Sequence, residues 1–287
     1  MISVLFAVLT ALSNGIASVL QRRAALTVPA GRAMRLSLIG YLLRQRVWLA
    51  GIALVIVAAV CQAVALATGP IAVVQPIFVI ELPAALLVAG FALRVGVTRT
   101  VWYGVAAVTL GLALGMAAAS PSGGSEDVRG AAWVQALVAT GAFEAALIAL
   151  ARSTSGNARA ALLGLAAACG YALTAALMKD AMSHLGSGAA ALLTSWQLYA
   201  TAAAGVGALF LLQNALQAGS LVAVQPMLTL GDALISIAYG VTLFGEELRT
   251  GWWLLPQLIA VALISCGCVV LARSPLATAK AAPSRVD

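Results

Sequence analysis

Three acidic residues stand inside long apolar stretches of the sequence: Glu81, Glu144 and Asp232. A carboxyl group surrounded by hydrocarbon is costly unless it is protonated, hydrated or paired, so each of these residues is a candidate for function. Glu81 and Asp232 each follow a Gln-Pro pair, Gln75-Pro76 and Gln225-Pro226, by six or seven residues. The chemistry that they indicate is binding of a cation or a proton. The alternative is a protonated carboxyl group that is hydrogen-bonded to a neighbouring helix.

Polar residues follow Asp232 along one face of its predicted helix. They recur at intervals of three and four residues, at Gln225, Thr229, Asp232, Ser236 and Tyr239. A shorter stripe near the start of the chain holds Thr10, Asn14, Ser18 and Gln21. Such a stripe does not face lipid; it lines a wet cavity or makes hydrogen bonds between helices. The candidate ligands are therefore Glu81, Asp232, Gln75, Gln225, Asn14, Thr229, Ser236, Tyr239 and Glu144.

Apolar segments position these residues. The chain has 287 residues, of which 63% are hydrophobic and only 9% are charged, whereas a soluble domain carries about 25% charged residues. The apolar blocks are about 20 residues long and do not alternate, which predicts membrane-spanning helices rather than a β-barrel. We expect an all-α integral membrane protein with nine spans, at about 3–21, 47–68, 70–93, 101–119, 131–151, 159–178, 189–212, 219–243 and 252–272. The arginine-rich stretch 24–46 predicts an interfacial helix, with a tenth span as the alternative.

The basic residues are distributed unevenly between the two sets of alternating loops. One set holds only Arg129, Lys179 and Arg249, and the other holds the rest of the 16 Lys and Arg residues. Loops rich in Lys and Arg stay in the cytoplasm, which predicts an outside N-terminus and an inside C-terminus in the cell membrane. The same rule explains the net charge of +7 without any binding of nucleic acid.

An internal repeat divides the chain. Residues 65–76 read ALATGPIAVVQP and residues 215–226 read ALQAGSLVAVQP. The predicted topology puts corresponding positions on opposite sides of the membrane, as in the inverted repeats of secondary transporters. We therefore expect 47–119 and 197–272 to superpose after a rotation of about 180° about an axis in the membrane plane. The organisation is an N-terminal repeat (1–119), a polar loop and linking span (120–158), a C-terminal repeat (159–273) and a disordered tail (274–287).

Signatures of enzymes are missing from the sequence. It contains no phosphate-binding loop, HExxH or GxSxG motif, so we expect no enzyme activity and no cofactor. The four cysteines fall in apolar blocks and are interpreted as packing residues. The charged pairs Lys179-Asp180 and Glu246-Glu247 lie at span ends, where we expect them to extend to the membrane surface.

The segments GPIAVVQPIFVIELPAALLVAGFAL and GSLVAVQPMLTLGDALISIAYGVTLFGEEL resemble the EamA-like proteins of the drug/metabolite transporter superfamily. The resemblance covers nearly all of residues 1–273. The closing Gly-Glu-Glu is similar to a Gly-Glu motif of that superfamily, whereas the first half has Arg94-Val95-Gly96 instead. The nine-span layout, with SVLQRRA, ALTAALMKDA and LLQNALQAGSLVAVQP, resembles the NIPA-type magnesium transporters. The resemblance implies alternating access and a central cavity lined by the first three spans and the sixth to eighth, but it does not specify a substrate.

The sequence thus predicts a secondary transporter of a small polar or cationic solute, with Glu81 and Asp232 at the coupling or cation site. Three alternatives remain open: a transporter of magnesium or another divalent cation, a flippase for a lipid-linked carrier, and a subunit of a membrane complex that does not transport. The expected partners are the lipid bilayer and the solute, and a homodimer is also left open.

The predicted topology can be tested by labelling single cysteines in intact cells. A membrane-impermeant thiol reagent should modify a cysteine at Ser125 and leave one at Ser155 unmodified, because the charge distribution puts the first loop outside and the second inside. The reverse pattern would exclude the nine-span arrangement.

Overall fold

The computed structural model describes residues 2–25, 45–81, 83–85, 87–88, 98–124, 128, 130–219 and 221–273. Their long helices are α1 (Ile2–Ala25), α3 (Arg46–Thr68), α6 (Arg99–Ala119), α7 (Gly130–Arg152), α8 (Gly156–Ser183), α10 (Trp196–Ala218), α11 (Leu221–Thr242) and α12 (Leu254–Ala272). The shorter helices are α4 (Ile71–Ile77) and α9 (Ala189–Thr194), with 3₁₀ turns η2 (Phe78–Ile80), η3 (His184–Ser187) and η4 (Gly251–Trp253). Two short strands, β1 (Ser122–Gly123) and β2 (Glu246–Glu247), pair antiparallel.

The helices have the length and surface of membrane helices. Among the described residues, five helices are long and apolar enough to cross a membrane: 46–68, 99–119, 130–152, 156–187 and 251–271. Four more apolar helical stretches are shorter: 2–17, 71–85, 196–212 and 226–242. Large apolar side chains are exposed along their outer faces, for example Val206, Phe210 and Leu258. The chain is therefore an all-α membrane protein with one added pair of very short strands.

Contacts between loops show which helix ends lie together. Lys179, near the end of α8, donates to the carbonyl group of Gly69, just after α3, and the N–H of Arg249 donates to the carbonyl group of Ala119, at the end of α6. Trp133 of α7 and Gln197 of α10 both bind Asp180 of α8 from the first turns of their helices. We call this end of the bundle the Glu246 end, because Glu246 lies at its centre. Here α3, α6, α8 and α11 finish, while α4, α7, α10 and α12 begin.

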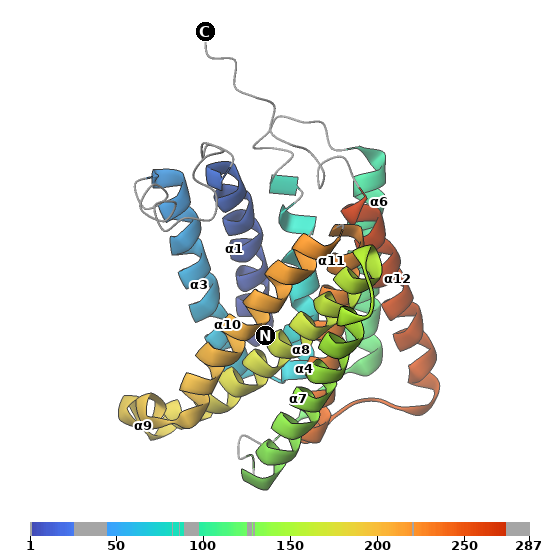
Figure 1. The fold of residues 1–287 in the computed structure, drawn as a ribbon. Coiled ribbons are helices and arrows are strands. Elements are labelled where there is room, and N and C mark those ends of the chain that lie inside the picture. The colour runs from blue at the N-terminus through green and yellow to red at the C-terminus, as the bar shows by residue number, and fades with distance from the viewer. Residues whose placement is uncertain are drawn as a thin grey trace.

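The helices pack in pairs around α8 (Figure 1). The most extensive pairs are α1 with α3, α8 with α10, α8 with α11 and α6 with α12. α8 is the most buried of the long apolar helices, and its buried face consists largely of alanine and glycine. Small side chains let helix backbones approach closely in a membrane, where van der Waals contact is a main source of association.

Glycines form the crossing of α6 and α12. A Cβ added at Gly111 would lie 2.9 Å from the carbonyl oxygen of Ala260 and 2.8 Å from the Ile264 side chain. A Cβ at Gly267 would lie 2.9 Å from the carbonyl oxygen of Gly104. Backbone atoms cannot move aside as a flexible side chain can, so both glycines set the distance between these two helices.

The observed helices differ from the predicted spans in two places. The predicted span 189–212 is wrong at its start: Ser195 has an extended backbone, which separates the short α9 from α10. The predicted span 70–93 begins as α4 but becomes a 3₁₀ turn at Phe78, two residues after Pro76. Proline lacks the N–H that an α-helix needs, and this loss favours the change. Most of 24–46, the last residues of 70–93 and the tail 274–287 lie outside the described residues.

The crossing of α6 and α12 gives a stability test. Gly111→Ala should lower the free energy of unfolding by about 1–3 kcal/mol, because the methyl group overlaps backbone atoms of α12. The matched control is Gly141→Ala in α7, where an added Cβ meets nothing within 4 Å. Thermal melting of the two variants in detergent should show a lower Tm for Gly111→Ala alone, and equal Tm values would contradict the packing described above.

Candidate functional site

Glu81 directly follows the 3₁₀ turn that continues α4. Its helix lies against α1 at Gly15, where an added Cβ would be 3.1 Å from the Glu81 carbonyl oxygen and 3.0 Å from the Ala85 nitrogen. This close approach also brings the side chain of Asn14 to the Glu81 carboxyl group, with which it forms a hydrogen bond. α1 therefore supplies both the space for Glu81 and its amide partner.

Asp232 is held in a similar way on α11. The preceding residue, Gly231, lies against α8, where a Cβ would be 2.9 Å from that of Ala168. One turn later, the buried hydroxyl group of Ser236 donates a long hydrogen bond of 3.5 Å to Oδ1 of Asp232. The contact with α8 fixes the rotation of α11, and this rotation directs Asp232 toward the first half of the chain.

The structure places the two predicted acids in the same region of the helix bundle. The carboxyl groups of Glu81 and Asp232 are close enough to interact electrostatically, and both act on the Tyr171 hydroxyl group of α8. Neither side chain is fully buried, although each lies among apolar helices. Two carboxylates in a site of low dielectric repel each other unless they share a proton or a cation. The pair can therefore take up one of the two.

Gln75, another member of the predicted set, has a buried polar atom without a partner among the described residues. Its side chain is 3% exposed, and its amide nitrogen has no hydrogen-bond partner among the described residues. Ile71 lies beside Gly240 where α4 and α11 meet, so Gln75, one turn further, lies at the level of Ser236. A buried donor without a partner is rare and costs free energy.

The other predicted residues have different environments. Tyr239 and Thr140 of α7 share a hydrogen bond between their hydroxyl groups, so Tyr239 joins two helices. The carboxyl group of Glu144 lies beside Gly170 of α8, where Gly170 packs on Ala208 of α10. Thr229 lies on α11 and is partly exposed, while the side chain of Gln225 lies outside what the structure describes.

Sequence reasoning missed the role of Glu246. Its carboxylate accepts the N–H groups of Ile71 (2.6 Å) and Ala72 (2.9 Å) at the start of α4. Lys179 lies 3.4 Å from the same carboxylate and its Nζ lies 5.1 Å above the ring of Phe244. The interpretation that Glu246 extends to the membrane surface was wrong, because Glu246 is 2% exposed. Glu246 is buried because the loop between α11 and α12 folds back onto the start of α4, and its position at the end of a span does not reveal this.

Asp180 was also placed at the surface by the sequence, and the structure buries it. Its Oδ2 atom accepts hydrogen bonds from the indole of Trp133 (2.7 Å) and the amide of Gln197 (2.9 Å). Trp133 in turn packs edge-on against Trp196. Asp180 thus ties α8 to α7 and α10. No local signal in the sequence indicates this burial, because the partners Trp133 and Gln197 lie 47 and 17 residues away from Asp180.

No group of three or more His, Cys, Asp or Glu side chains that could hold a metal ion occurs among the described residues. The hydrogen-bond partners of the two carboxyl groups are neutral side chains, Asn14 for Glu81 and Ser236 for Asp232, and the hydroxyl group of Tyr171 lies within electrostatic range of both acids. Such a donor set suits a proton, or a cation that retains part of its water shell.

Comparison with known proteins adds one relative. The chain is 24% identical over 280 residues to an uncharacterized protein of Corynebacterium glutamicum, and the match covers 96% of each chain. No family model matches the chain, and no solved structure matches it. The relative is described as uncharacterized, so the comparison supplies a similar chain of the same extent and no activity.

Proposed function

We propose that the protein is a secondary transporter of the cell membrane that moves a small polar or cationic solute by alternating access. Glu81 and Asp232 form the coupling site, with Asn14, Ser236 and Tyr171 around them. The observation that carries the proposal is that the carboxyl groups of Glu81 and Asp232 interact electrostatically among apolar helices. The two acids come from helices that correspond to each other in the repeat, at an offset of about 150 residues. A carboxyl group in such a place is expensive and is typical of ion and substrate pathways.

The order of the helices supports an inverted repeat of nine spans. α3 ends at the Glu246 end of the bundle, whereas α10, its counterpart in the repeat, begins there. The pairs α1–α3 and α8–α10 are likewise equivalent in the two halves. Binding near the middle of the membrane, at the interface of inverted halves, is the plan of many secondary transporters. The site residues also come from α1, α4, α8 and α11, which are among the spans that the resemblance to drug/metabolite transporters implies as lining.

A divalent cation is the second candidate substrate, because the same carboxyl pair favours it. Mg²⁺ often retains several waters and uses only one or two carboxylates. The two candidates predict different behaviour at the carboxyl pair. In a proton-coupled transporter, a pH gradient drives uptake of the solute. In a divalent-cation transporter, Mg²⁺ competes with another divalent ion for the two carboxylates. A transport assay with both a metabolite panel and a divalent-cation panel separates them.

Neutral replacements of the two acids test the coupling role. Asp232→Asn and Glu81→Gln should keep the fold, because the amides are nearly isosteric and can still form hydrogen bonds. Each should abolish gradient-driven accumulation in proteoliposomes, measured as uptake per folded molecule with and without a pH gradient, because the amide carries no exchangeable charge. Exchange of solute without net proton movement should survive.

The matched control is Glu247→Gln, which removes an exposed carboxylate at one end of the bundle and should leave uptake unchanged. Full accumulation in both Asp232→Asn and Glu81→Gln would exclude these residues from coupling. A variant with normal uptake but a lower Tm would show that its carboxyl group only stabilises the helices.

A further inference from the structure

We infer that Glu246 and Lys179 form a gate, closed in this structure, between the Glu246 end and the carboxyl pair. The inference rests on the proposed transport function and adds the contact that separates its two states. In an alternating-access transporter, one end of the pathway is held shut by contacts between the two halves while the other end is free to open. The contacts at the Glu246 end have this character.

Both contacts of the gate join one half of the chain to the other. Lys179 of α8 donates to the Gly69 carbonyl group (2.8 Å), which belongs to the turn between α3 and α4. Glu246, in the loop between α11 and α12, binds the N–H groups of Ile71 and Ala72 at the start of α4. A rocking motion of the halves against each other would therefore break both contacts together.

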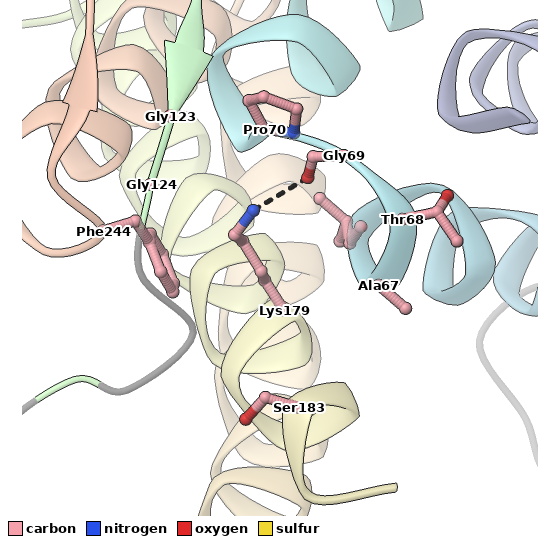
Figure 2. Close-up of a pocket in the computed structure, with 10 residues that line it drawn as sticks. Ala67, Thr68, Gly69, Pro70, Gly123, Gly124, Lys179, Ser183 and Phe244 are labelled. Carbon is pink, nitrogen blue, oxygen red and sulfur yellow. Dashed lines mark hydrogen bonds between the residues drawn. The ribbon is translucent and has the colours of Figure 1, made fainter. Parts of the chain in front are cut away.

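A polar cavity adjoins the gate. Its volume is about 250 Å³, and its lining includes Thr68, Gly69, Gly124, Ser183 and Lys179. Figure 2 shows the Lys179 side chain reaching across to Gly69, with Phe244 on the other side of the same side chain. The cavity forms a vestibule, and Lys179 lies in its wall. A solute in the vestibule would therefore contact the Lys179 ammonium group and the α3–α4 turn before it could reach the carboxyl pair.

The loop around Glu246 is shaped to hold the carboxylate in one place. Gly240 has no room for a Cβ, which would overlap Oε2 of Glu246 and lie 3.1 Å from the Ile71 side chain. Gly124 lies close on another side, where its Cβ would be 3.2 Å from Cγ of Glu246. The pairing of β2 with β1 fixes the loop itself. Two glycines and a strand pair therefore confine the carboxylate to the position that it needs in the closed state.

The environment of Gln75 independently indicates that the gate has an open state as well as the closed one. Gln75 lies one turn beyond Ile71, on the inner side of the gate, and its amide nitrogen is buried without a hydrogen-bond partner among the residues that the structure describes. A buried donor of this kind gains a hydrogen bond when water or solute reaches it. Opening the gate would admit either one, so the closed state leaves unsatisfied a group that the open state satisfies.

Distances between spin labels test the gate without depending on transport. Labels at Thr68 and Ser187, both exposed, lie on opposite sides of the contact between Gly69 and Lys179. They are introduced after replacement of the four native cysteines, and the protein is measured in lipid nanodiscs. The unaltered gate should give one short distance. Lys179→Met and Glu246→Gln should each add a longer distance, because loss of one charge-assisted hydrogen bond shifts an opening equilibrium by about tenfold or more.

The matched control is Glu247→Gln, next to Glu246 but exposed, which should leave the single distance. If Glu246→Gln does not fold, as judged by gel filtration, Lys179→Met decides, because it leaves the α4 contact of Glu246 in place. An unchanged single distance in folded Lys179→Met would overturn the gate. The distance measurement and the transport assay can fail separately. If the distance is unchanged but Asp232→Asn loses uptake, the gate is excluded and the proposed function is supported. If the longer distance appears but no solute or ion is taken up, the gate is supported and the proposed function is not.

Discussion

The first backbone N–H groups of a helix have no partner within that helix, and in a membrane they cannot turn to water instead. In α4 the Glu246 carboxylate, which lies about 175 residues further along the chain, accepts hydrogen bonds from the N–H groups of Ile71 and Ala72. One interaction thus satisfies a helix start and a buried charge together. Lys179 balances that charge, and Gly240 and Gly124 leave the space. The close packing of α4 against α11 depends on this arrangement, and with it the level at which Glu81 meets Asp232.

Small residues carry the rest of the architecture. Gly15 and Gly231 let α1 and α8 approach the helices that bear the two acids, and Gly111 and Gly267 do the same for α6 and α12. Hydrophobic burial cannot drive these contacts, since lipid is as apolar as the side chains themselves. Close backbone contact and a few polar bonds between helices take its place. Polar bonds between helices are few, and the one between Tyr239 and Thr140 joins α11 to α7.

Hydrophobic length was enough to predict most of the helices, because a membrane imposes the same length on every span. The repeat then predicted that Glu81 and Asp232 lie at one depth, and the structure places them in the same region of the helix bundle. It could not predict that Ser195 interrupts a span, since α9 and α10 read as one apolar block. It also could not predict that Glu246 and Asp180 are buried, because their partners lie up to 175 residues away in the sequence and no local pattern records them. Lys179 and Glu246 looked like surface charges for the same reason.

α8 carries groups that serve both centres. Tyr171 lies within electrostatic range of Glu81 and Asp232, and Lys179 donates to the Gly69 carbonyl group in the α3–α4 turn. Eight residues of helix separate Tyr171 and Lys179 by about 12 Å. An α-helix is stiff over this length, and no proline interrupts it between the two residues. A shift of α8 along its axis would therefore move Tyr171 and Lys179 by the same distance. α8 therefore holds the Tyr171 hydroxyl group and the Lys179 ammonium group at a fixed separation along one helix.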